Sequence, residues 1–146
     1  GSLTEADKAI LDQAWALADR SRAAMKDYAL HHALGEIWKV VADANRYFAS
    51  EEPWAKGKSD PERRGTILWI TAEVLRNVAI MAQPFIPTAA GKLLDLVGSA
   101  NDARDFAHVG AAHKIEGGLI LPTPAPIFPR YVEAEEGAPT GGKAKS

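Results

Sequence analysis

Apolar side chains recur at every third or fourth position along three long stretches of this chain, at about 4–27, 34–48 and 61–82. This spacing places them on one face of a helix, and such a face must be buried against a partner. The stripe of the last stretch is wide enough to contact more than one neighbour. The sequence therefore predicts an all-α fold.

Capping and breaking residues separate these stretches. Thr4 can cap the first helix, and Pro53 supports an end of the second near residues 48–50. Asp60 can cap the third helix with Pro61 at its first position, and Pro87 can start a fourth helix at about 88–97. We expect an antiparallel bundle of four to five helices in which Phe85 and Ile86 fill the corner between the last two.

The periodicity fades after residue 98. Residues 102–108 can form one or two further helical turns, and the proline-rich stretch 119–129 is typical of extended chain lying over the bundle. The predicted organisation is an engineering scar and start at 1–3, the bundle with its extended segment at 4–132, and a disordered tail at 133–146. The scar suggests that the chain was cut from something longer.

Composition excludes several classes of protein. Cysteine is absent, so disulfides and thiolate metal sites are impossible. No uninterrupted apolar run approaches the roughly 20 residues of a membrane span, and we expect no membrane partner. With 17 basic and 19 acidic residues the net charge is -2, so any contact with nucleic acid must be local.

The sequence contains no complete motif for catalysis or metal binding. Gly57-Lys58-Ser59 lacks the first glycine of a phosphate-binding loop, and Glu51 and Glu52 are adjacent rather than placed around a substrate. His32 and Glu36 have the spacing of two metal ligands but no third. His31, His108 and His113 likewise lack a pattern that would make them ligands or bases. We predict no catalytic residue and no metal site in this chain.

Trp54 is the strongest candidate for a binding residue. Trp15, Trp38 and Trp69 fall within helical patterns and are expected in the core or in helix packing. Trp54 instead follows a rigid proline and precedes Lys56 and Lys58. An aromatic ring beside cations is a common way to hold an unstacked RNA base, although a loop tryptophan that packs back onto the bundle is equally ordinary.

The residues around Trp54 also carry a family resemblance. Asn45-Arg46-Tyr47 followed by Pro53-Trp54 resembles the anticodon-binding domain of bacterial methionyl-tRNA synthetases, and the resemblance extends over about 34–132. The segment 83–90 resembles the proline corner that these domains share with the leucyl, isoleucyl and valyl enzymes. Ile127-Phe128-Pro129-Arg130 resembles the terminal segment of the catalytic and anticodon-binding core of the bacterial enzymes.

The resemblance implies a role for each matching residue. Trp54 would stack on an anticodon base of tRNA(Met), Pro53 would set its position, and Arg46, Lys56 and Lys58 are possible contacts to the tRNA backbone. The family's base-reading Asn-x-x-x-Arg pair lies on an earlier helix and has no match here, so we expect the isolated chain to bind tRNA weakly.

The resemblance also describes a parent enzyme. That enzyme would be a cytoplasmic ligase that uses ATP with Mg²⁺ to attach methionine to its tRNA, with its catalytic domain in the same polypeptide. The ATP-binding motifs are absent here, so no cofactor and no activity are expected in this fragment. The alternative is a structural or protein-interaction helix bundle with no RNA-reading role, in which Trp54 is packed inward.

Overall fold

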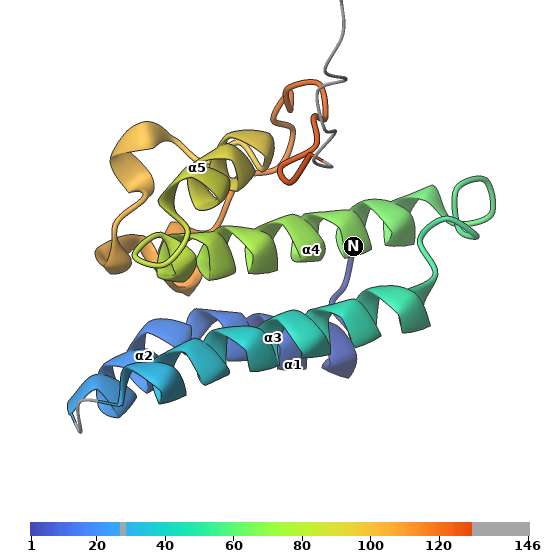
Figure 1. Cartoon of the computed structure of the whole chain (residues 1–146). Coiled ribbons are helices and arrows are strands. Elements are labelled where there is room, and N and C mark those ends of the chain that lie inside the picture. Colours follow the sequence, from blue (N-terminus) through green and yellow to red (C-terminus); the bar gives the residue numbers. More distant parts are fainter. Residues whose placement is uncertain (27–28, 130–146) are drawn as a thin grey trace, which may run out of the picture.

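The computed structural model describes residues 1–26 and 29–129, and within these ranges it contains helices and turns but no strand. Five α-helices follow one another along the chain, as Figure 1 shows: α1 (Glu5–Trp15), α2 (Leu17–Lys26), α3 (Leu30–Glu51), α4 (Pro61–Ala82) and α5 (Pro87–Leu96). The predicted all-α helix bundle is confirmed. The tail predicted at 133–146 lies outside the described residues.

Helix α4 is the centre of the bundle. It contacts α1, α2 and α3 on one side and α5 on the other (Figure 1). The prediction that its wide apolar stripe meets several neighbours is therefore confirmed. The main core consists of side chains from α1 to α4 that are almost fully buried, among them Ile10, Leu11, Ala14, Leu17, Ile37, Val40, Ile67, Ile70 and Val74.

By length and composition alone, α4 could also cross a membrane. Its most apolar 18-residue stretch has a mean hydropathy of 1.3, but 67% of that stretch is buried inside the bundle. The helix also carries Glu73, Arg76 and Asn77, whose buried side chains bond to neighbouring segments. These features identify α4 as the core helix of the bundle.

Local capping explains where the helices begin. The Asp7 amide donates to Thr4 Oγ1 (3.3 Å), and the Thr4 amide donates to Asp7 Oδ2 (2.8 Å), which forms the predicted cap of α1. Asp60 accepts from the Arg63 amide (2.9 Å) at the start of α4. Pro61 and Pro87 each occupy the first position of a helix, as predicted.

The single helix predicted at about 4–27 is divided. Helix α1 ends at Trp15 and α2 begins at Leu17, with Ala16 between them. Neither glycine nor proline marks this point, so local sequence offers no signal for it. The interruption coincides with a tertiary contact, because the Trp15 indole N–H donates to the buried Glu73 of α4 (2.9 Å).

Two side chains expected inside the bundle are exposed. Trp38 was expected in helix packing, but it is 57% exposed, because the buried stripe of α3 runs through Ala33, Ile37, Val40 and Tyr47. Ile86 was expected to fill the corner after α4 and is 41% exposed. Of the two residues expected to fill this corner, only Phe85 is partly buried and packs against the core.

After α5 the chain forms short turns and then extended segments. Three 3₁₀ turns follow one another at Asn101–Ala103, Phe106–His108 and Ala111–His113, in place of one or two turns at 102–108. Leu119 and Leu121 are half-exposed and line a small hollow with Trp69 of α4. The extended segment thus touches the bundle, although Ile120 is fully exposed to solvent.

Candidate functional site

The loop between α3 and α4 places Trp54 at one end of the bundle. Helix α3 ends at Glu51, and the next residue, Glu52, has left-handed backbone angles (φ 46°, ψ 56°) that turn the chain away from the helix axis. Pro53 is buried behind this turn, whereas Trp54 is 64% exposed. The backbone therefore directs the indole toward solvent and not into the core.

The Trp54 ring lies beside Phe48 of α3. Their ring centroids are 5.9 Å apart and their planes are inclined by 58°, which is a favourable aromatic arrangement. Phe48 itself packs against the core. This contact supports the indole from one side and leaves most of its surface accessible to a flat ligand.

The basic side chains near the loop differ in whether they already have a partner. Arg46 on α3 is exposed and pairs with Asp43, and the Lys56 ammonium group donates to the carbonyl of Glu51. Lys58 is exposed and makes no ion pair within the described residues. The structure thus brings the predicted cations to the same end of the bundle as Trp54, but Lys56 is already bonded to the helix end.

Arg64 is a further cation beside the loop that the motif search did not select. It is exposed on the first turn of α4, and a Cβ atom added at Gly57 would lie 3.3 Å from its Nη1 atom. Glycine at position 57 therefore allows the guanidinium to approach the loop closely. The signal in the sequence was present, because Arg64 belongs to the basic stretch that follows Trp54.

Arg63 has a structural role. Its guanidinium bridges two helices, since Nη2 is 2.8 Å from Asp7 Oδ1 of α1 and 2.8 Å from Glu51 Oε2 of α3. The Tyr47 hydroxyl donates to Asp7 Oδ1 (2.6 Å). This polar cluster of Asp7, Tyr47, Glu51 and Arg63 joins α1, α3 and α4 at the end of the bundle that carries the loop.

The charges of this cluster stabilise one another. Burial alone would raise the pKa of Asp7, but its hydrogen bonds from Arg63, Tyr47 and Thr4 lower that pKa well below the usual value. Burial and the neighbouring Asp7 raise the pKa of Tyr47, and the hydrogen bond to Asp7 raises the pKa of Arg63. At neutral pH the cluster is therefore a fixed ion pair with a neutral tyrosine, which suits a scaffold and not proton transfer.

A second polar cluster lies in the middle of α4. Glu73 accepts from the Trp15 indole (2.9 Å), from Arg76 Nε (2.9 Å) and from the Ile115 amide (3.0 Å). Asn77 accepts from the Gly110 amide (2.9 Å). Burial opposes ionisation of Glu73, but these donors lower its pKa overall. The cluster holds the segment after α5 against the bundle, and sequence reasoning missed it although its polar residues interrupt an apolar stripe.

In the described part of the chain, no three histidine or acidic side chains lie together as possible metal ligands. Glu36 pairs with Arg20 (3.0 Å) and not with His32. The sequence showed no pattern that would orient His108 as a base, but its Nδ1 atom lies 2.7 Å from Asp105 Oδ1. This exposed pair caps a short turn, since Asp105 also accepts from the Ala107 amide.

Fold and site together define an all-α domain with an aromatic side chain presented in a loop among cations. A family model of the anticodon binding domain of methionyl tRNA ligase matches residues 1–138. The chain belongs to this family. It spans only about a quarter of the length of the curated relatives that it matches.

Individual relatives agree with this assignment. The methionine–tRNA ligase of Brucella melitensis is 60% identical over 136 residues, which are 93% of this chain and 26% of that protein. The enzyme of Mycobacterium tuberculosis is 42% identical over 135 residues, 90% of this chain and 26% of that protein. The apo crystal structure of the M. tuberculosis methionyl-tRNA synthetase superposes with a TM-score of 0.83 at 42% identity and covers 90% of this chain and 27% of that one.

Proposed function

We propose that this domain reads the anticodon of tRNA(Met) within a methionine–tRNA ligase, by stacking an anticodon base on Trp54. The observation that carries the proposal is the 64% exposure of an indole that the backbone holds in place. Stacking of a base on an aromatic side chain contributes on the order of 1 to 3 kcal/mol. In this proposal Pro53 positions the indole and Phe48 supports it.

The charge distribution is consistent with a local contact of this kind. Lys58 and Arg46 are exposed near the loop and could neutralise phosphates of the anticodon stem-loop, whereas Lys56 would first have to leave the Glu51 carbonyl. Arg64 joins this group as a further phosphate contact. Because the whole chain has a net charge of -2, affinity for RNA would come from this end of the bundle and not from a general positive field.

The parent protein would carry the chemistry. We infer a cytoplasmic enzyme that activates methionine with ATP and Mg²⁺ and then transfers it to tRNA. A related M. tuberculosis synthetase has been solved with bound methionyl-adenylate, at a TM-score of 0.82 and 41% identity over 88% of this chain and 26% of that one. The domain would act as an identity check, because a correctly held anticodon positions the acceptor end in the catalytic domain.

The alternative is a helix bundle that serves only packing or protein interaction. In that case Trp54 should be packed inward, and its exposed indole favours the RNA-binding alternative instead. A nonspecific anion site is a further alternative, in which affinity would depend on salt but not on the sequence of the anticodon.

Titration of the complete enzyme with tRNA(Met) and with tRNA carrying an altered anticodon separates these possibilities. We expect the altered anticodon to weaken binding at every salt concentration, because the contacts that read base edges in the complete enzyme are lost while the phosphates remain. Stacking on an aromatic ring tolerates any base and does not contribute to this difference. Equal affinity for both tRNAs, with a steep dependence on salt, would refute anticodon reading in favour of nonspecific anion binding.

A further inference from the structure

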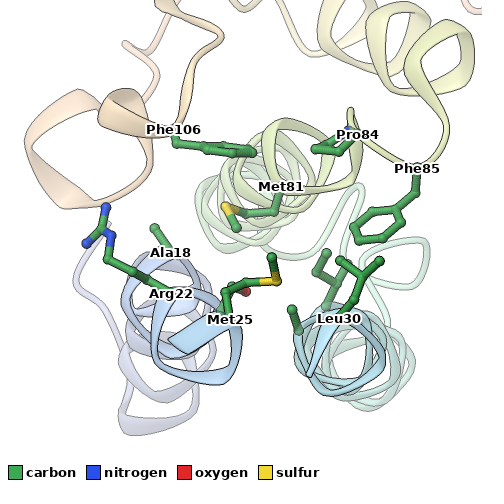
Figure 2. A pocket seen from close by; sticks show the side chains of 11 residues that line it. Ala18, Arg22, Met25, Leu30, Met81, Pro84, Phe85 and Phe106 are labelled. Carbon is green, nitrogen blue, oxygen red and sulfur yellow. The ribbon is translucent and has the colours of Figure 1, made fainter. Parts of the chain in front are cut away.

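An apolar cavity of about 270 Å³ lies between α2, α3, the end of α4 and the turn at Phe106 (Figure 2). Leu30, the first residue of α3, lines it, whereas Trp54 follows the last turn of the same helix. With 22 residues, α3 is about 33 Å long at about 1.5 Å per residue. The cavity is therefore at the opposite end of the bundle from the proposed anticodon site.

Sulfur and aromatic groups make up much of the cavity wall. Figure 2 shows Met25 of α2 and Met81 of α4 reaching toward the same space, with Phe85 and Phe106 at its sides. These are the only two methionines in the sequence. Thioethers are polarisable and make favourable contacts with aromatic rings, on the order of 0.3 to 1.5 kcal/mol each. The wall therefore favours an aromatic occupant over a purely aliphatic one.

One buried hydroxyl group lines this cavity without a partner. Ser21 is only 4% exposed, and its Oγ atom forms no hydrogen bond within the described residues. An unpaired buried hydroxyl costs roughly 1 to 3 kcal/mol. A trapped water would need two or more polar partners, but among the described residues of the wall the only other polar side chain is Arg22, which already pairs with Asp19.

We propose that this cavity binds a small neutral aromatic alcohol, whose rings lie between Met25 and Met81 and whose hydroxyl group bonds to Ser21 Oγ. An apolar cavity of about 150 Å³ accommodates benzene, so about 270 Å³ suits a molecule of two fused rings. A charged ligand is disfavoured, because the wall offers it little to offset the loss of its hydration.

Methyl NMR of the chain labelled with ¹³C at its methionine methyl groups tests this proposal, since both signals report on the cavity wall. The probe is 2-naphthol, and naphthalene is the matched ligand without a hydroxyl group. We expect 2-naphthol to shift both signals in a saturable manner. Ser21→Ala should lower the affinity for 2-naphthol about threefold to tenfold, the range of one net hydrogen bond, and leave the affinity for naphthalene unchanged.

One further variant and one further measurement complete the test. Ala18→Leu places a larger side chain in the cavity wall and should reduce the binding of both ligands. Ser21→Ala alone should leave the melting temperature unchanged or raise it, because its hydroxyl has no partner to lose.

Three results would overturn the proposal. Methionine signals that stay fixed up to the solubility limit of 2-naphthol would rule out the site. Equal affinity of the parent chain and Ser21→Ala for 2-naphthol would rule out the hydroxyl contact. A clear fall in the melting temperature of Ser21→Ala would show that the hydroxyl is already satisfied. If Ala18→Leu does not fold, the Ser21 comparison still decides.

Discussion

Two exposed tryptophans on or next to α3 differ in how the chain presents them. Trp38 is 57% exposed on a regular helical surface, and Trp54 is 64% exposed in a loop. Only Trp54 follows a left-handed residue and a buried proline, and within the described residues only Trp54 of the two has an aromatic neighbour, which is Phe48. Exposure alone therefore does not identify a binding residue, but exposure on a rigid, supported turn does support a binding role.

The left-handed residue before this turn gives a prediction at the residue scale. A side chain at Glu52 makes its backbone conformation unfavourable by roughly 1 kcal/mol, and glycine has no such penalty. We expect Glu52→Gly to increase the free energy of unfolding by about that amount in urea denaturation. Ala49→Gly, in the last turn of α3, is the control and should lower the free energy of unfolding by a similar amount. A loss of stability in Glu52→Gly would contradict this account.

Single residues also show what sequence can and cannot predict. The position of Trp54 followed from Pro53 and from the end of the helical pattern, which are local signals. The exposure of Trp38 did not, because apolar spacing cannot tell which part of a wide stripe a neighbour covers. The engagement of Arg63 with Asp7 could not be predicted either, since the two residues are 56 positions apart and meet only after three helices pack.

At the scale of elements, the polar cluster of Asp7, Tyr47, Glu51 and Arg63 bonds α1, α3 and α4 to one another. Asp7 is fully buried and the Arg63 side chain is 15% exposed. A buried ion pair contributes little relative to apolar packing, but the loss of one partner leaves the other charge poorly compensated. The cluster should therefore be sensitive to single substitutions.

Asp7→Asn tests this sensitivity. We expect it to lower the free energy of unfolding by about 3 kcal/mol, because the charge that faces Arg63 disappears and the cap of α1 is weakened. The exposed Asp12→Asn in the same helix is the matched control and should change it by less than about 0.5 kcal/mol. Urea denaturation measures both variants, and equal effects would show that the cluster does not hold the helices together.

The boundaries of elements were predictable to different extents. The starts of α4 and α5 follow from Asp60-Pro61 and Pro87, whose effects on the backbone are local. The break at Ala16 could not be predicted, because it coincides with a contact between Trp15 and Glu73 across the bundle. The helical period alone predicted the fold class, while tertiary contacts determined where one helix became two.

At the scale of the whole molecule, two buried carboxylates make stability depend on pH. The pKa values of Asp7 and Glu73 are lower in the folded chain than their ordinary values. Their contribution is thus complete above the unfolded value of about 4 and is lost as the pH falls through the lower folded values. We expect the free energy of unfolding to be constant from pH 7 to about 5 and to fall steeply below about 4.

The variants identify the source of this acid sensitivity. Asp7→Asn and Glu73→Gln should each flatten the decline in unfolding free energy between pH 4 and 2, measured by urea titration at fixed ionic strength, while Asp12→Asn should keep the slope of the parent chain. A slope that neither buried variant changes would assign the acid sensitivity to other groups.

The whole molecule also divides into two ends. The loop with Trp54 is at one end of α3 and the cavity lined by Met25 and Met81 is at the other. The core helix α4 extends from the loop to the cavity, with the polar cluster of Glu73 in its middle. This separation means that a variant at Trp54 leaves the core intact, so a change in tRNA charging can be assigned to the loop.

The most direct measurement is the kinetics of Trp54→Ala in the full-length enzyme, with Trp38→Ala as the matched control. If Trp54 stacks on an anticodon base, the kcat/KM of the Trp54→Ala enzyme for charging tRNA(Met) should fall about tenfold to a hundredfold. Its rate of methionine-dependent pyrophosphate exchange should stay near the parent value. Trp38→Ala should change neither reaction. Equal loss of charging and of pyrophosphate exchange in Trp54→Ala, or full retention of charging, would contradict the account.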